Sequence, residues 1–178
     1  MKGIIFNLLQ AVTEEVHDEQ MWDELLQTAD LDGAYTALGN YPDEELDALM
    51  VALGRRTGRD VDEVLQWLGR QAMPHLADRY PAFFAPPDPV SFVLTLHDVI
   101  HSEVTKLYPG ARPPTLTFGD VTPRSVTVDY RSHRALSDLG IGFLHGAADV
   151  YAHRAEIVRT MRDPDGTHVS LRCRFEPT

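Results

Sequence analysis

The hydrophobic pattern of this sequence changes its period once, near the prolines at positions 109, 113 and 114. Before them, apolar residues recur at every third or fourth position, which is typical of amphipathic helices. After them, much of the chain alternates between apolar and polar residues, as strands with one buried face do. The predicted helices span about residues 3–16, 19–28, 43–53, 61–77 and 89–108. The predicted strands cover about 116–118, 125–134, 157–161 and 169–175, with a helix at 137–152 between the second and the third.

This order of elements restricts the fold class. Helices followed by a β-β-α-β-β run favour an α+β fold with a four-stranded antiparallel sheet. Asp163-Pro164-Asp165-Gly166 has the composition of a tight turn and is expected to join the last two strands. The length of 178 residues fits one domain.

The charge balance is strongly acidic, with 27 Asp and Glu residues against 16 Lys and Arg and a net charge of −11. Such a chain is poorly suited to bind nucleic acid, because that binding depends on cationic side chains that displace counterions. The same charge disfavours docking onto anionic lipid, and no apolar run approaches the length needed to span a bilayer. We therefore expect neither a nucleic acid nor a membrane among the partners.

The single cysteine, Cys173, can form neither an internal disulfide nor a multi-cysteine zinc site. The pattern around it predicts a packed strand residue. The first residues are apolar, but the run is short and is followed by Glu14 and Glu15 instead of a small-residue cleavage site. We interpret Met1 as the mature start and expect a cytoplasmic protein.

Two histidines, His97 and His101, lie four residues apart on the helix predicted at 89–108. This spacing places both imidazoles on one helix face, and both fall inside a broad apolar arc. A buried histidine is more often a hydrogen-bonded core residue than a metal ligand, and the helical pattern does not choose between the two. His97-Asp98-Val99-Ile100-His101 also approximates the His-Glu-x-x-His motif of zinc proteases, although the shorter aspartate would reach a zinc-bound water poorly.

A second polar set, Tyr130, Ser132 and Arg134, is spaced by two residues within a predicted strand. On a strand, that spacing puts the three side chains on one face. Two hydroxyl groups and a guanidinium suit a carboxylate or phosphate group. A solvated strand face is the alternative interpretation, and the spacing alone favours it.

In this order and register, the segments resemble the H-NOX family, the haem–nitric oxide/oxygen binding domains related to the haem domain of soluble guanylate cyclase. The resemblance covers essentially the whole chain. It is carried by Met1-Lys2-Gly3-Ile4-Ile5-Phe6-Asn7-Leu8, Gly69-Arg70-Gln71, the block from His97 to Pro109, Ala111-x-Pro113-Pro114, Tyr130-x-Ser132-x-Arg134 and Gly142-Phe143-Leu144-x-Gly146. It implies the H-NOX fold, with a helical subdomain of about 1–63 packed on an α/β haem-ligating subdomain of about 64–178 and haem b between them.

The resemblance also implies which residue binds the haem iron. In the family, the proximal ligand lies seven residues before the tyrosine of a Leu-Tyr-Pro motif, which here is Tyr108. Counting back gives His101 as the iron ligand and leaves His97 as a core or rim neighbour. Pro114 corresponds to the family proline that presses on the porphyrin and distorts it.

Further roles in haem binding follow from the same resemblance. Tyr130, Ser132 and Arg134 become the clamp on the haem propionates. The resemblance assigns Ile5, Leu9, Leu139 and Leu144 to the cofactor pocket, and it implies that Ile4 and Leu8 help Ile5 and Leu9 to cover the distal side of the cofactor.

Gas selectivity is expected to follow from the residues on the distal side of the haem. Family members that hold oxygen usually carry a tyrosine five residues after the arginine of the motif, and here that position is Leu139. Leu9 and Ala72 stand where oxygen binders carry a tryptophan and an asparagine. We therefore expect a sensor that binds nitric oxide and carbon monoxide at ferrous haem and excludes oxygen.

Signalling is expected to follow release of the His101 imidazole when nitric oxide binds, so that the helical half shifts against the α/β half. We expect no enzymatic activity of the chain itself. The chain ends without an effector domain, so the expected partner is a separate signalling enzyme, such as a histidine kinase or a cyclic-di-GMP enzyme. Ser137 and Cys173, with His168 nearby, do not supply the cysteines of the structural zinc site found in some family members, so no zinc is expected.

Two other functions remain possible from the sequence. The first is an interaction domain that keeps the fold without the cofactor, and the full propionate clamp together with His101 argues against it. The second is a zinc-dependent hydrolase that uses the His-Asp-x-x-His segment at 97–101.

Overall fold

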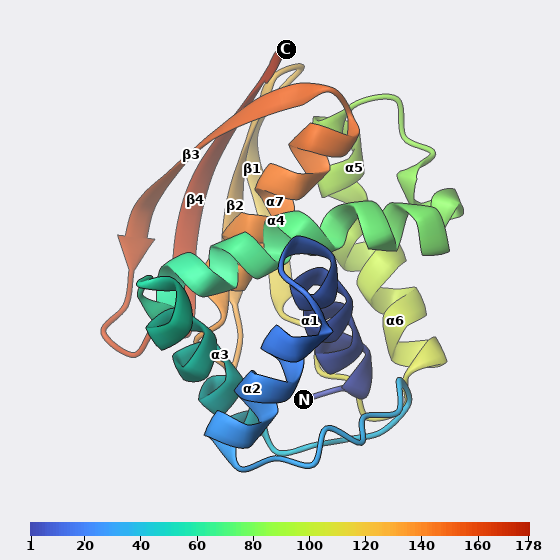
Figure 1. Ribbon diagram of the computed structural model, residues 1–178. Coiled ribbons are helices and arrows are strands. Elements are labelled where there is room, and N and C mark those ends of the chain that lie inside the picture. The colour runs from blue at the N-terminus through green and yellow to red at the C-terminus, as the bar shows by residue number, and fades with distance from the viewer.

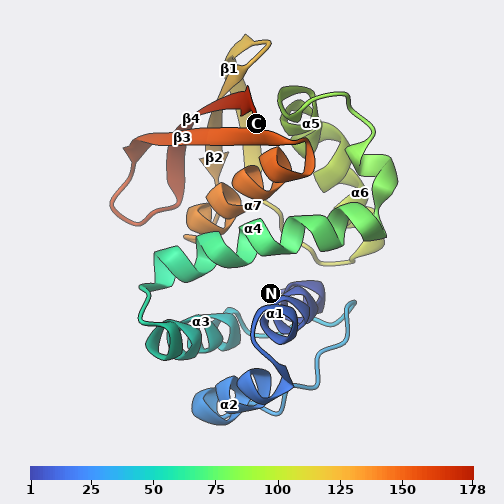
Figure 2. The same ribbon diagram turned by 45° about the horizontal axis from the view of Figure 1, so that its top comes forward.

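The computed structural model describes residues 1–178, and a layer of helices lies against a second layer in which one helix packs on a sheet (Figures 1 and 2). The α-helices are α1 (Gly3–Val16), α2 (Glu19–Ala29), α3 (Asp43–Thr57), α4 (Val61–Arg79), α5 (Pro89–Thr95), α6 (Ser102–Leu107) and α7 (Ser137–Val150). A 3-10 helix η1 (Pro81–Phe84), a π-helix η2 (Leu96–His101) and the strands β1 (Thr115–Thr122), β2 (Ser125–Arg131), β3 (His153–Arg162) and β4 (His168–Pro177) complete the fold. No helix combines the length and the apolarity that crossing a bilayer requires.

The first four helices begin and end close to where the sequence predicts. Asp60 and Glu63 form a reciprocal capping box at the start of α4, and Gly58 ends α3 in the left-handed conformation with φ 70°. The start of α1 has no side-chain cap. Its first N–H groups, from Gly3 and Ile4, donate instead to carbonyls of residues 39 and 37, so the loop between α2 and α3 replaces the cap.

The sheet is antiparallel with strand order β1-β2-β4-β3, which confirms the predicted four-stranded sheet. Alternating residues of β2 and β4 face inward as direct pairs, for example Val128 with Leu171 and Val126 with Cys173. Cys173 is fully buried, as predicted, and burial raises the pKa of its thiol to about 12, so the thiol stays protonated. The predicted turn at 163–166 joins β3 to β4.

Helix α4 takes part in both hydrophobic cores. Its residues Leu65 and Leu68 pack with α1, α2 and α3, whereas Met73 packs with α5, α7 and the sheet. In Figure 2, α4 runs between α1 and α3 below it and α7 above it. The predicted boundary near residue 63 falls in the first turn of this shared helix and stays a prediction.

Three glycines allow α4 and α7 to touch along their backbones. A Cβ atom added to Gly142 would lie 2.2 Å from the carbonyl oxygen of Gln66, and one added to Gly69 would lie 2.4 Å from that of Leu139. Gly146 meets the carbonyl of Arg70 in the same way, at 2.5 Å. No side chain larger than hydrogen fits at this crossing.

Several predicted elements need correction. Two strands are longer than predicted, because β1 runs to Thr122 where 118 was expected and β3 begins at His153 where 157 was expected. The helix predicted as one piece at 89–108 is interrupted, because η2 adopts the wider π-helical turn between α5 and α6. Strand β2 ends at Arg131, whereas the prediction ran to 134. The chain turns there because Arg134 N–H donates to the Ser132 hydroxyl oxygen (3.1 Å) instead of continuing the ladder.

We predict that Gly142→Ala destabilises the protein. Alanine in place of glycine inside a helix ordinarily stabilises it by up to about 1 kcal/mol. Here the methyl group would meet the Gln66 carbonyl, and overpacking should cost about 2 kcal/mol or more in the free energy of unfolding. Urea denaturation measures the change. Gly119→Ala is the control, because nothing lies within 4 Å of its Cβ, and an equal loss in both variants would contradict the close crossing.

Candidate functional site

An apolar cavity of about 350 Å³ is bounded by α1, α7, the sheet and the α5–η2–α6 segment. Of its 34 lining residues, 24 are hydrophobic, so the interior suits a large apolar group with few polar attachments.

Eight of the nine residues predicted to contact a cofactor line this cavity. They are Ile5, His101, Pro114, Tyr130, Ser132, Arg134, Leu139 and Leu144. Leu9 does not line it: its side chain is fully buried in the core that α1 forms with α3 and α4. One residue earlier, Leu8 lies at the cavity wall, because successive residues of a helix point about 100° apart.

His101 is the last residue of η2 and faces the cavity. Burial and the neighbouring His97 together lower the pKa of His101 to about 4, and the carbonyl of Pro114 acts in the opposite direction. The imidazole is therefore neutral at pH 7, which is the form that binds metals. Its Nδ1 atom is buried and makes no hydrogen bond within the chain. Four other buried side-chain atoms of the chain also lack a partner, but His101 is the only one of these residues that lines the apolar cavity, so its imidazole is the candidate ligand.

His97 has a different environment. Its Nδ1 accepts a hydrogen bond from the backbone N–H of Leu116 at 3.3 Å, and its side chain does not line the cavity. The imidazole thus attaches η2 to β1. No group of three or more His, Cys, Asp or Glu side chains is arranged to hold a metal ion. Only His101 faces the cavity, whereas His97 bonds to the backbone of β1, so the zinc-protease interpretation, which needs both imidazoles on one metal ion, is not favoured.

The Tyr-x-Ser-x-Arg set gathers at one part of the cavity wall, although only Tyr130 belongs to a strand. Burial raises the pKa of Tyr130, so its hydroxyl stays protonated and can donate a hydrogen bond. The Tyr130 hydroxyl lies 3.5 Å from the carbonyl of Arg134. The turn after β2, and not strand geometry, therefore brings the three side chains together.

Arg134 also forms an ion pair that sequence reasoning missed. Its Nε donates to Asp43 at 2.5 Å and its Nη1 to the carbonyl of Arg112 at 3.4 Å, while Nη2 makes no hydrogen bond within the chain. The Met1 amino group donates to the other Asp43 oxygen at 2.6 Å. Asp43 lies in the first turn of α3, where an acidic side chain suits the helix dipole without any distant partner, so its pairing across 91 positions left no local signal.

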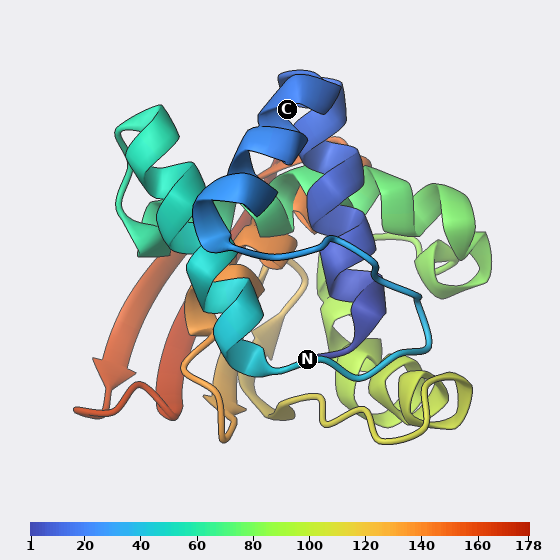
Figure 3. The same cartoon turned by 60° about the horizontal axis from the view of Figure 1, so that its bottom comes forward.

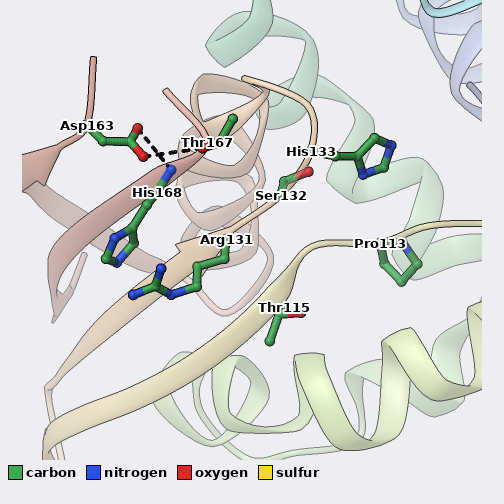
Figure 4. Close-up of a pocket in the computed structure, with 8 residues that line it drawn as sticks. All are labelled: Pro113, Thr115, Arg131, Ser132, His133, Asp163, Thr167 and His168. Carbon is green, nitrogen blue, oxygen red and sulfur yellow. Dashed lines mark hydrogen bonds between the residues drawn. The ribbon is translucent and has the colours of Figure 1, made fainter. Parts of the chain in front are cut away.

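A second hollow, of about 410 Å³, shares Pro113 and Ser132 with the apolar cavity (Figure 4). None of its eight lining residues is hydrophobic. In Figure 4, Asp163 is engaged by the Thr167 hydroxyl (3.2 Å) and the His168 backbone N–H (3.1 Å). This lining of polar side chains with a single proline does not suit an apolar cofactor, so the apolar cavity is the candidate site.

Comparison with known proteins supports this assignment. The model of a family described as "Haem-NO-binding" matches residues 2–159. No curated protein matches the sequence at the threshold applied.

Among solved structures, a Fe(II) unliganded H-NOX protein from K. algicida is 29% identical, with a TM-score of 0.88 over 100% of this chain and 98% of that one. An H-NOX protein from S. oneidensis in the Fe(II)NO ligation state is 28% identical, with a TM-score of 0.89 over 99% of both chains. An oxygen-binding H-NOX domain related to soluble guanylate cyclases is 24% identical, covers 98% of this chain and 95% of that one, and shares the fold with a TM-score of 0.84.

We predict that the Asp43–Arg134 pair stabilises the fold only while the carboxylate is ionised. Burial opposes ionisation, but hydrogen bonds from Arg134 and the Met1 amino group outweigh it and lower the pKa of Asp43. A lowered folded-state pKa stabilises above the unfolded pKa, near 4, and this contribution is lost as pH falls through the folded value. Because the Asp43 side chain is 38% exposed, Asp43→Asn should cost only about 0.5–1 kcal/mol at pH 7.

The measurement is thermal or urea unfolding of the wild type and Asp43→Asn between pH 7 and pH 3. The difference between them should shrink below about pH 4. Glu44→Gln, in the same exposed first turn of α3, is the matched control and should change little. A difference that is unchanged at pH 3 would show that the pair does not act through its charge.

Proposed function

The chain belongs to the Haem-NO-binding family, the H-NOX proteins, and from this premise we propose that it is a sensor that binds nitric oxide and carbon monoxide at haem and excludes oxygen. Members of the family bind haem and sense gases. The observation that carries the proposal is the neutral, buried imidazole of His101, which faces an apolar cavity and lacks a hydrogen-bond partner at Nδ1.

The residues of the cavity fit haem b. His101 would supply the iron ligand, and Tyr130, Ser132 and Arg134 would donate hydrogen bonds to the two carboxylates. Apolar side chains such as Pro114, Ile5, Leu139 and Leu144 would contact the porphyrin. When bound, haem would supply an iron centre able to bind an imidazole and a diatomic gas, and the binding of nitric oxide would weaken the hold of His101 on it.

Exclusion of oxygen follows from the lack of a donor on two helices of the cavity wall. α1 contributes Ile4, Ile5 and Leu8, and α7 contributes Leu139, Gly140, Phe143 and Leu144. None of these side chains can donate a hydrogen bond to the partly negative oxygen ligand. His145 directly follows Leu144 on α7 and could donate a hydrogen bond, but its side chain is not part of the cavity lining.

The proposed signal begins at His101. Detachment of His101 from a bound haem would free the π-helical turn η2 that carries it, and Pro114, on the same cavity wall, would adjust with the cofactor. The helical layer could then shift relative to the sheet, which is a two-state change driven by ligand binding. The proposed recipient is a separate signalling enzyme, such as a histidine kinase or a cyclic-di-GMP enzyme.

We predict that His101→Gly removes the protein ligand of the iron. The ferrous protein should lose its wild-type Soret spectrum and haem content should fall, and added imidazole should restore both by binding in the space that the side chain vacates. Absorption spectra and haem-to-protein ratios measure this. His97→Ala is the matched control and should keep the wild-type spectrum, because His97 does not line the cavity. An unchanged spectrum in His101→Gly would refute the assignment, and wild-type protein without any Soret band would favour a cofactor-free interaction domain.

We also predict that the purified ferrous protein forms no stable oxygen complex in air. Leu139→Tyr should create one, because a hydroxyl donor to a charged acceptor is worth about 1.5–3 kcal/mol, or roughly a tenfold or greater slowing of oxygen dissociation. Leu139→Phe is the control that adds the ring without the hydroxyl. Stopped-flow absorption measures the rates, and a stable oxygen complex of the wild type would overturn the proposed selectivity.

A further inference from the structure

Lys2 is a buried lysine, only 8% exposed, that lines the wall of the apolar cavity. Its ammonium group donates to the carbonyl of Leu38 (2.5 Å), to Oδ1 of Asn40 (3.1 Å) and to the carbonyl of Pro109 (3.1 Å). It forms no ion pair with a carboxylate. Lysines are rarely buried unless they are paired with an acid, because an ammonium loses much hydration free energy in the interior. Such a costly arrangement indicates a specific role.

The three acceptors belong to two different parts of the chain. Leu38 and Asn40 lie in the loop between α2 and α3, and Pro109 follows the end of α6. Gly110, with φ 82°, lies next to Asn40 as well, because a Cβ atom added to it would be 3.6 Å from the Asn40 Oδ1 atom. Figure 3 shows the N-terminus beside this loop. The ammonium of Lys2 is therefore the charged group that joins the α2–α3 loop to the residues just after α6, the helix that continues from His101.

The same loop caps α1. Gly3 N–H donates to the carbonyl of Gly39, Ile4 N–H to that of Ala37, and Lys2 forms a β-bridge with Asn40. Any displacement of Pro109 relative to this loop must stretch hydrogen bonds of the Lys2 ammonium. Hydrogen bonds from a charged donor are roughly twice as strong as neutral ones, so the junction resists such stretching. α1 in turn presents Ile4, Ile5 and Leu8 to the cavity.

We propose that Lys2 is a positioning residue that couples the end of α6 to α1. A displacement of α6, which directly follows His101, is passed to the helical layer through the hydrogen bond between Lys2 and the Pro109 carbonyl. This inference rests on the proposed function, because it assigns the path by which release of His101 reaches the rest of the molecule. Lys2 touches neither the iron nor the gas in this role. It links two helices that contribute different parts of the cavity wall.

The test is hydrogen–deuterium exchange of the haem-loaded protein, with and without nitric oxide, in the wild type, Lys2→Met and Lys106→Met. Methionine keeps the unbranched shape of lysine and removes the ammonium. Lys106 is the matched control: it lies on α6, is 65% exposed and pairs only with Glu103 on the same helix. Peptides covering residues 102–108 report on α6, and peptides covering 3–6 and 36–41 report on the start of α1 and its capping loop.

In the wild type and Lys106→Met, nitric oxide should change exchange in all three regions. In Lys2→Met, the change at 102–108 and the absorption spectrum of the nitric oxide complex should persist, while the change at 3–6 and 36–41 is lost. In haem-free Lys2→Met, the amides of Gly3 and Ile4 should exchange faster than in haem-free wild type, because their capping loop is held less firmly. Lys2→Arg, which keeps a charged donor, should regain part of the nitric oxide response at 3–6.

The inference is overturned if Lys2→Met passes the nitric oxide response to residues 3–6 as the wild type does, or if the wild type shows no response there. Wild-type protein without a haem band, or without a nitric oxide response at 102–108, would instead overturn the proposed function. If Lys2→Met fails to fold, Asn40→Ala removes one acceptor at an exposed position. That variant should weaken the response at 3–6 selectively, and an undiminished response would equally overturn the coupling.

Discussion

The backbone contact between α4 and α7 is the constraint on which the rest of the structure depends. Hydrophobic side chains usually keep two helices about 8–10 Å apart, and the glycines at 69, 142 and 146 remove that spacer. α4 contributes to both hydrophobic cores, so its crossing with α7 sets how the helical layer faces the sheet. Both helices then give residues to the cavity wall, for example Met73 from α4 and Phe143 from α7.

Two polar connections secure the same arrangement away from the crossing. Asp138, in the first turn of α7, is almost fully buried and accepts hydrogen bonds from Arg159 of β3 (2.6 Å) and Gln66 of α4 (2.8 Å). Asp43 pairs with Arg134 and thereby joins α3 to the turn after β2. Removing Arg159 would leave the buried Asp138 carboxylate without its charged partner, which costs several kcal/mol, whereas the partly exposed Asp43 contributes less. Arg134, at the polar part of the cavity wall, is thus held by a carboxylate that lies outside the cavity lining.

The sequence predicted the elements well and the site in part, for identifiable reasons. The spacing of hydrophobic residues and the capping residues of helices are local features of the sequence. Helices α1 to α4 and the order of the strands could therefore be predicted from them. The helical wheel could not separate His97 from His101, because it assumed a regular helix where the chain forms a π-helical turn. Leu9 was placed in the pocket by resemblance, whereas its helical phase directs it into the core and Leu8 to the wall. Contacts of Lys2 and Asp43 join residues distant in sequence and leave no periodic signal.

The π-helical turn at Leu96–His101 has a consequence for how chains of this kind can change over time. A π-helical turn holds one residue more than an α-helix needs over the same span. Deleting one exposed residue there, such as Val99, would yield a more regular helix and leave α5 and α6 close to their present phase, because the turn already accommodates the extra residue. The segment that carries the imidazole is therefore also the segment of this helix that can lose a residue with least disturbance to its neighbours. A length change within Leu96–His101 would act on the hold of the chain on His101 before it acted on the rest of the fold.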